Sequence, residues 1–184
     1  MCIANYYLHY LGIAHRDVKL SNFVIRHNSE TKEVKVLMID FNSAAFFDLK
    51  TKFLTFEGTV HFAPPEGLDS IDEGYSPIQY DIWSLAICLY CMYHCKLPFD
   101  LDDEDDMYGY EIKMHMKILK DKPNFSDTPE PLKTLLKGML IKDWKKRYTW
   151  DDIWKCELFK KIGLSVSVGV FENKEDSLIT EEKS

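Results

Sequence analysis

The chain has 184 residues, 46% of them hydrophobic, and a formal net charge of −7 at pH 7. This length can bury one good core, so we expect a single domain. The acidic balance argues against a surface that binds nucleic acid or anionic membranes, and the longest apolar run, residues 82–93, is too short to cross a bilayer. The first twelve residues lack the charged start and cleavage site of a secretory leader. We therefore expect an intracellular protein, cytoplasmic or nuclear.

The cysteines are five in number, and three of them fall within one predicted helix: Cys88, Cys91 and Cys95. A disulfide framework is geometrically awkward there, so we predict free thiols in a reducing compartment. A metal site built from these three and His94 is the alternative. A second ligand pair with zinc spacing does not follow in the sequence, which favours core packing.

A helix is predicted at the start of the chain, because apolar residues at helical spacing precede a C-cap glycine: Ile3, Tyr7, Leu8, Leu11 and Gly12. The helix leads into residues 15–22, HRDVKLSN, where Asp17, Lys19 and Asn22 stand at fixed intervals ahead of a strand. In such a loop an aspartate can accept the proton of an attacking hydroxyl and a lysine can contact a phosphate. The side-chain oxygen of an asparagine can bind Mg²⁺.

A β-hairpin is predicted next, because residues 23–25 and 34–39 are rich in strand-forming side chains and a polar run joins them. The second strand ends at Asp40, which places Asn22 and Asp40 side by side. Two oxygen ligands at neighbouring strand ends suit Mg²⁺. The alternative interpretation is a pair of polar residues that only cap their loops.

Three further motifs follow in order: IDF at 39–41, GTVHFAPPE at 58–66 and DIWSL at 81–85. Together with HRDVKLSN, they resemble the larger, C-terminal lobe of a eukaryotic protein kinase of the Ser/Thr type, over about residues 1–161. The resemblance implies a mainly α fold, a helical bundle with a small β-hairpin that carries the catalytic and metal-binding loops. It implies a kinase lobe over residues 1–162 and a polar, acidic and flexible tail over residues 163–184.

The resemblance also implies a reaction, the transfer of the γ-phosphoryl group of ATP to a Ser or Thr hydroxyl of a protein substrate. Asp17 would orient and deprotonate the hydroxyl, and Lys19 would steady the γ-phosphate. Asn22 and Asp40 would hold Mg²⁺, and Val24 would lie beneath the adenine ring.

Two positions depart from the family pattern. Asn42 follows Asp40 and Phe41 where a glycine is usual, and Pro64 stands at an alanine position. Asparagine tolerates a left-handed backbone at a cost of about 1 kcal/mol. We expect metal binding through Asp40 to survive, while the segment switches less easily between arrangements.

The resemblance assigns the activation loop to residues 43–57, for which the sequence shows no strong pattern. Thr59, after this loop, resembles the threonine that supports Asp17 and Lys19 in Ser/Thr kinases. Thr55 has the spacing of a regulatory phosphosite, where a phosphate could bind Arg16. Thr51 is the alternative site, and a solvated threonine without a regulatory role is a third interpretation.

A long buried helix is predicted after Ser76, its N-cap, and Pro77. Asp81 in this helix needs partners, because an unpaired buried charge is costly. The resemblance supplies them as backbone N–H groups around His15 and Arg16, in preference to a simple helix cap.

Further elements complete the lobe. The acidic residues 100–106 are interpreted as a solvated loop ahead of a helix at 107–120, with a dock for basic substrates as the alternative. Another amphipathic helix is marked by Leu132, Leu135, Leu136, Met139 and Leu140, and Thr149 with Asp152 predicts the cap of a last helix. The resemblance pairs Arg147 with Glu66.

The fourteen residues ahead of His15 contain no Gly-rich phosphate loop, no strand lysine and no partner glutamate of the kinase type. Positioning contributes about 7–11 kcal/mol to catalysis, so we expect low activity from the chain alone. One hypothesis is that the chain is one piece of a Ser/Thr kinase, with an N-terminal kinase lobe or a regulatory protein in trans as its partner. The other is a non-catalytic module that binds kinase substrates or partners.

Overall fold

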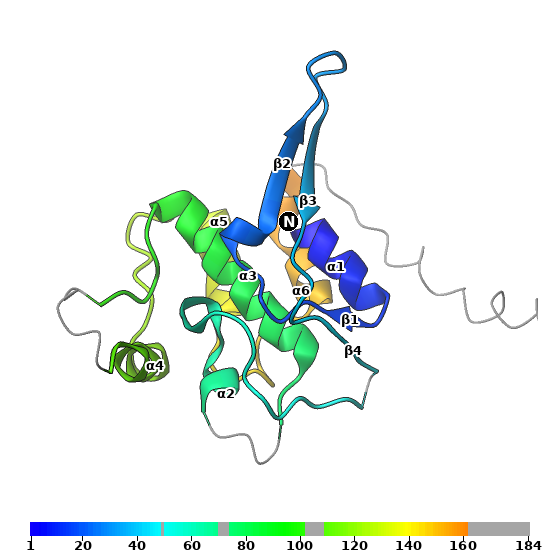
Figure 1. Ribbon diagram of the computed structural model, residues 1–184. Helices are drawn as coiled ribbons and strands as arrows, with labels where there is room; N and C mark the ends of the chain where they lie inside the picture. Colours follow the sequence, from blue (N-terminus) through cyan, green and yellow to red (C-terminus); the bar gives the residue numbers. More distant parts are fainter. Residues whose placement is uncertain (49, 70–73, 102–108, 162–184) are drawn as a thin grey trace, which may run out of the picture.

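The computed structural model describes residues 1–48, 50–69, 74–101 and 109–161 (Figure 1). The predicted tail at 163–184 lies outside these ranges, as does most of the acidic run at 100–106. The helices are α1 (Cys2–Tyr10), α2 (Pro65–Leu68), α3 (Pro77–His94), α4 (Tyr110–Lys120), α5 (Glu130–Met139), α6 (Trp150–Lys155) and α7 (Glu157–Lys161). The strands are β1 (Ile13–Ala14), β2 (Phe23–His27), β3 (Val34–Met38) and β4 (Ala45–Phe46), and the 3₁₀ turns are η1 (Leu20–Asn22) and η2 (Val60–Phe62).

Helix α3 runs through the middle of the molecule and contacts α1 and α5 (Figure 1). Buried side chains of α4, α6 and α7 belong to the same core. It begins as predicted, with the Ser76 Oγ accepting the Gln79 N–H and Pro77 in the first turn. Its large apolar side chains, including Ile82, Trp83 and Leu85, are fully buried. Burial reaches only as far as Tyr90, because Met92 and Tyr93 near the C-terminal end are 51% and 47% exposed.

Strands β2 and β3 form the predicted antiparallel hairpin, with Phe23 opposite Met38 and His27 opposite Val34. The Asn28 Oδ1 accepts two backbone N–H groups of the connecting turn, at 2.9 and 3.2 Å. This turn chemistry fixes the register, and the hairpin projects from the helical body (Figure 1).

A second two-stranded sheet was not predicted. Strand β4, within the segment without a strong sequence pattern, pairs antiparallel with β1, so that Ile13 lies opposite Phe46. The Phe47 N–H also donates to the Gly12 carbonyl at 2.8 Å. This pairing ties residues 45–47, at the start of the segment assigned to the activation loop by resemblance, to the chain just ahead of HRDVKLSN.

Helix α1 is present where it was predicted and is followed by Gly12 at φ +69°, but its buried face is not the predicted one. Ile3, Tyr7 and Leu11 are about half exposed. The inward side instead carries Cys2 with two polar residues, Asn5 and His9. The apolar periodicity therefore identified the helix but misplaced its core-facing side.

Two C-terminal elements match their predictions. The inward side of α5 carries Leu135, Leu136 and Met139, all fully buried. Helix α6 has a complete capping box, in which Thr149 and Asp152 each accept the other's backbone N–H. The described part of the helix predicted at 107–120 begins at Tyr110.

None of the helices in the described ranges has the length and apolarity that crossing a bilayer requires.

Candidate active site

Asp17, Lys19 and Thr59 form a compact polar cluster. The Lys19 Nζ lies 2.7 Å from the Asp17 Oδ2 and donates to the Thr59 Oγ1 at 3.0 Å. The Thr59 hydroxyl in turn donates to the Asp17 Oδ1 at 2.8 Å. The Asp17 and Lys19 side chains are 12% and 24% exposed, so the carboxylate is held in place while remaining accessible.

The close approach of two backbone segments at this cluster depends on Gly58. Its φ is +95°, and a Cβ atom at this position would lie 2.4 Å from the Arg16 carbonyl oxygen. Only glycine fits both constraints. Gly58 thereby brings Thr59 against the loop that carries Asp17.

Asn22, at the end of η1, is buried and oriented by Asp17. Its Nδ2 donates to the Asp17 carbonyl at 2.9 Å and to the Asp17 Oδ2 at 3.3 Å. The amide nitrogen therefore faces Asp17, and Oδ1 is the oxygen that this side chain could offer to a metal ion.

The start of β2 and the end of β3 are joined by a hydrogen bond from the Ile39 N–H to the Asn22 carbonyl, at 2.9 Å. Asp40, whose side chain is exposed, is the next residue after this junction. Asn42 does not use the left-handed backbone that asparagine tolerates, and Asp40 is left-handed instead, with φ +63°. Asn42 thus carries no such strain. A buried amide oxygen and an exposed carboxylate on adjoining segments fit the oxygen ligands that Mg²⁺ prefers.

The base of the β2–β3 hairpin, where its strands join the helical body, is flanked by His15, Val24 and Phe41. His15 is fully buried, and its Nε2 lies 3.1 Å from the Ile39 carbonyl oxygen. Its ring lies 5.1 Å from that of Phe41. Val24 and Phe41 are 42% and 46% exposed, so His15 supports this surface from beneath and is not part of it.

Asp81 accepts the backbone hydrogen bonds that were predicted for it. The His15 N–H donates to Oδ2 at 2.7 Å and the Arg16 N–H donates to Oδ1 at 2.8 Å. Arg16 has a left-handed backbone at φ +62°. Asp81 therefore holds the HRDVKLSN loop in a conformation that the loop sequence alone does not favour.

A third partner of Asp81 was missed by the sequence analysis. The Trp150 Nε1–H donates to the His9 Nδ1 at 2.8 Å, so the His9 proton sits on Nε2 and is donated to the Asp81 Oδ2 at 2.8 Å. The available signal was the spacing of Asn5 and His9, four residues apart on a helix, which puts two polar residues on one face. The apolar pattern of the opposite face obscured it.

Glu66 and Arg147 form the predicted ion pair, which is bidentate. The Arg147 Nη1 and Nη2 donate to the two Glu66 oxygens at 2.6 and 2.9 Å. Nη1 also donates to the Gln79 carbonyl and Nε to the Ile141 carbonyl. The Arg147 side chain is fully buried. The pair therefore joins α2, the start of α3 and the chain ahead of α6.

The surroundings of Arg16 bear on the predicted phosphosite. The Arg16 Nε donates to the Ser43 carbonyl at 2.6 Å, and its guanidinium lies 4.8 Å from the ring centre of Phe53. Thr55, two residues farther, is exposed, and its carbonyl accepts the Tyr75 hydroxyl at 2.7 Å. The Arg16 guanidinium thus packs against the segment that carries Thr55.

All five cysteines are free thiols. Burial raises the pKa of Cys2 and of Cys91 to about 11, and it raises the pKa of Cys88 further. Within the part of the chain that the structure describes, no three His, Cys, Asp or Glu side chains gather as a metal site. The alternative that joined three cysteines with His94 in such a site has no support in these contacts.

The protein kinase domain model matches residues 1–159, and the chain belongs to the protein kinase family. It is 33% identical over 148 residues to protein kinase kin1 of Schizosaccharomyces pombe, covering 80% of this chain and 15% of that protein. It is 32% identical over 184 residues to a calcium/calmodulin-dependent protein kinase kinase of Emericella nidulans, covering 96% and 33%. With a Caenorhabditis elegans protein of that same description, identity is 37% over 142 residues, covering 74% and 24%. The chain therefore spans a third or less of the length of these relatives.

Proposed function

We propose that the chain acts in a Ser/Thr protein kinase, as the larger lobe that carries the catalytic loop. The lobe comprises residues 1–162, and residues 163–184 form a polar, acidic tail. Its reaction is transfer of the γ-phosphoryl group of ATP to a Ser or Thr hydroxyl of a protein substrate. The observation that carries the proposal is the Asp17 carboxylate, held between the Lys19 ammonium and the Thr59 hydroxyl.

Asp17 is the group that orients the acceptor hydroxyl and takes its proton. Both carboxylate oxygens are fixed by hydrogen bonds, so the side chain is pre-positioned before a substrate arrives. Lys19 contacts Asp17 at the edge of the cluster, and its ammonium steadies the transferred phosphate. Thr59 is a positioning residue, because it acts through Asp17 and Lys19.

Asn22 and Asp40 are the residues that would hold Mg²⁺, and Val24 would contact the adenine of ATP. When bound, the metal neutralises charge that develops on the phosphate oxygens. Asn22 presents Oδ1 because Asp17 fixes its Nδ2, and Asp40 adds an exposed carboxylate. The five free thiols fit an intracellular, reducing compartment.

The test is phosphoryl transfer from radiolabelled ATP to Ser/Thr peptides, in the presence of a donor N-terminal kinase lobe. Asp17→Asn keeps the size of the side chain but removes the base, so we expect the rate to fall about 10²- to 10⁴-fold. Asp127→Asn, which makes the same change at an exposed position, is the matched control and should leave the rate unaltered.

A rate that is insensitive to Asp17→Asn would contradict the proposal. The second candidate is a non-catalytic binding module, which the exposed apolar side chains of the hairpin favour. That candidate predicts association with a donor lobe or regulatory protein, without transfer that depends on Asp17.

A further inference from the structure

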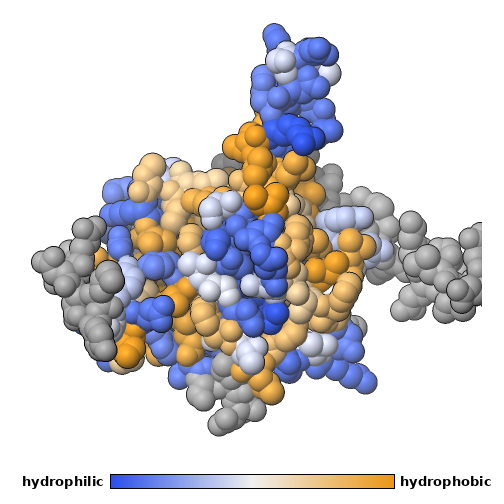
Figure 2. Space-filling model, in the orientation of Figure 1, coloured by the Kyte–Doolittle hydropathy of each residue, from blue (hydrophilic) through white to orange (hydrophobic). Residues whose placement is uncertain are grey.

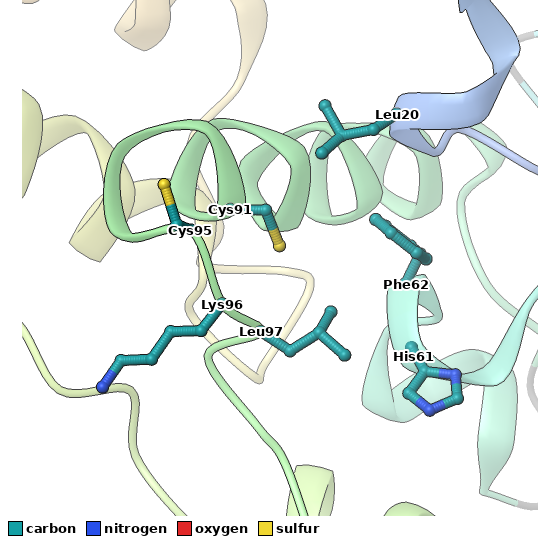
Figure 3. Close-up of a pocket in the computed structure, with 7 residues that line it drawn as sticks. All are labelled: Leu20, His61, Phe62, Cys91, Cys95, Lys96 and Leu97. Atoms are coloured by element: carbon teal, nitrogen blue, oxygen red, sulfur yellow. The ribbon is translucent and has the colours of Figure 1, made fainter.

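A pocket of about 510 Å³ lies between the C-terminal end of α3 and the segments that carry Leu20 and Phe62 (Figure 3). Its lining residues are Leu20, His61, Phe62, Cys91, Cys95, Lys96 and Leu97. Figure 3 shows the side chains of Leu20, Phe62 and Leu97 and the Cys91 thiol converging on a common space, whereas the Lys96 side chain extends away from it. We call this site the apolar pocket.

The apolar pocket adjoins both segments that build the catalytic cluster. Leu20 is the third residue after Asp17, and Phe62 is the third residue after Thr59. Three residues of chain span at most about 11 Å. A substrate peptide with its acceptor hydroxyl at Asp17 therefore reaches the pocket with a side chain two or three residues away.

The side chains that converge in the pocket are uncharged. Burial, with the nearby Asp100 carboxylate, raises the pKa of the Cys91 thiol to about 11, so the thiol is neutral at pH 7. The His61 Nε2 is already engaged with the Tyr110 hydroxyl at 2.9 Å. No carboxylate belongs to the lining among the residues that the structure describes. A Lys or Arg side chain that entered would lose hydration without gaining a partner from the lining.

We propose that the apolar pocket selects substrates with a large aliphatic or aromatic side chain, such as Leu, Met or Phe, within three residues of the acceptor Ser or Thr. The inference rests on the proposed kinase function, since it assumes that the acceptor hydroxyl lies at Asp17. It names a selectivity that the catalytic cluster itself does not provide. The size of the pocket lies within the range of sites that bury small ligands.

The experiment measures binding of fluorescent peptides to the 184-residue chain by anisotropy. Alanine replaces the acceptor residue and ATP is left out, so that no transfer intervenes. Leu, Ser or Arg is then placed in turn at each of three positions on either side. At one of these positions we expect Leu to bind about 10- to 100-fold more tightly than Ser or Arg, as expected for burial of one such side chain.

Two pairs of variants assign the effect to the pocket. Cys91→Glu places a carboxylate in the lining. We expect the preference for Leu to fall and the affinity for the Arg peptide to rise at least tenfold. Cys91→Ser, which is nearly isosteric and uncharged, should keep the preference for Leu. Leu97→Ala removes part of the apolar wall and should weaken Leu binding selectively. Leu89→Ala is its control, because Leu89 is a partly buried leucine of α3 outside the lining. Thermal melts confirm that each variant is folded.

Equal affinity for the Leu, Ser and Arg peptides at every position would overturn the proposal, as would a Leu preference that Leu97→Ala leaves intact. This readout is independent of catalysis, because binding is measured without ATP. Selective binding together with transfer that does not depend on Asp17 would contradict the proposed kinase reaction instead.

Discussion

Thr51 and Thr55 differ in their surroundings, although they lie four residues apart in the same segment. The Thr51 hydroxyl donates to the Asp48 Oδ1 at 2.7 Å, and hydrogen bonds from Thr51 and Lys50 lower the pKa of Asp48. A phosphate on Thr51 would therefore lose this bond and face a charged carboxylate. Thr55 is exposed, and Arg16 stacks on the ring of Phe53 two residues away.

We predict that Thr55 is the regulatory phosphosite of this segment. A phosphate there gains one or more charge-assisted hydrogen bonds from the Arg16 guanidinium, which orders the loop. Mass spectrometry of the protein from its native cells should find phosphate on Thr55, and Arg16→Gln should abolish any activation that Thr55 phosphorylation produces. Occupancy at Thr51 with Thr55 unmodified is the contrary result.

At the scale of elements, the four-residue helix α2 is too short to be stable by itself and depends on the Glu66–Arg147 pair. We predict that Arg147→Ala and Glu66→Ala each lower the free energy of unfolding by about 3–5 kcal/mol, because truncation leaves the other member of a buried pair without its partner. Denaturant melts measure the loss.

Lys137→Ala is the control for this prediction, because Lys137 is an exposed cation of α5 and its loss should change stability by less than about 0.5 kcal/mol. If Arg147→Ala were no more destabilising than the control, the ion pair would have no part in holding the elements together.

The elements that were predicted from the sequence are those with a clear hydrophobic periodicity or a helix-capping residue. The α3 cap at Ser76 and the β2–β3 hairpin follow from local residue chemistry, and so does the capping box of α6. The pairing of β1 with β4 did not follow, because a two-residue strand has no measurable alternation and its partner lies about thirty residues away. The buried side of α1 was misassigned because tertiary hydrogen bonds satisfy His9.

The residues that form the site were easier to predict from the sequence than the backbone conformation that places them. The positions of Asp17, Lys19 and Asn22 in HRDVKLSN indicated their proximity, and motif likeness indicated Thr59. The left-handed backbone of Asp40 was not predicted, because residue type is a weak guide to which position of a tight turn becomes left-handed.

The whole molecule exposes an apolar surface at the base of the hairpin, which Figure 2 shows between the hydrophilic hairpin tip and the helical body. Val24, Leu37, Ile39 and Phe41 are between 38% and 46% exposed there. An exposed group of this kind marks an interaction site. We propose that an N-terminal kinase lobe covers it, with the buried ring of His15 as support beneath.

We predict that the 184-residue chain alone binds Mg-ATP weakly and transfers phosphate slowly, and that a donor N-terminal kinase lobe raises both affinity and rate. Positioning of the nucleotide by a second lobe is the physical reason. Leu37→Ser should weaken association with the donor lobe. Val34→Ser, the same kind of apolar-to-polar change at the opposite end of β3, serves as the comparison. Full Asp17-dependent turnover by the chain alone, with no gain from a donor lobe, would contradict this prediction.

The hydrogen bond from Trp150 to His9 spans 141 positions of sequence. During synthesis, the loop that carries Asp17 leaves the ribosome before Trp150 does. The residue that completes the support of this loop, through His9 and Asp81, follows more than a hundred residues later. Contacts of such separation form late, because the intervening chain must first be ordered. The catalytic loop therefore reaches its final geometry only when the lobe is nearly complete, and a nascent chain that ends before α6 holds the catalytic residues without their full support.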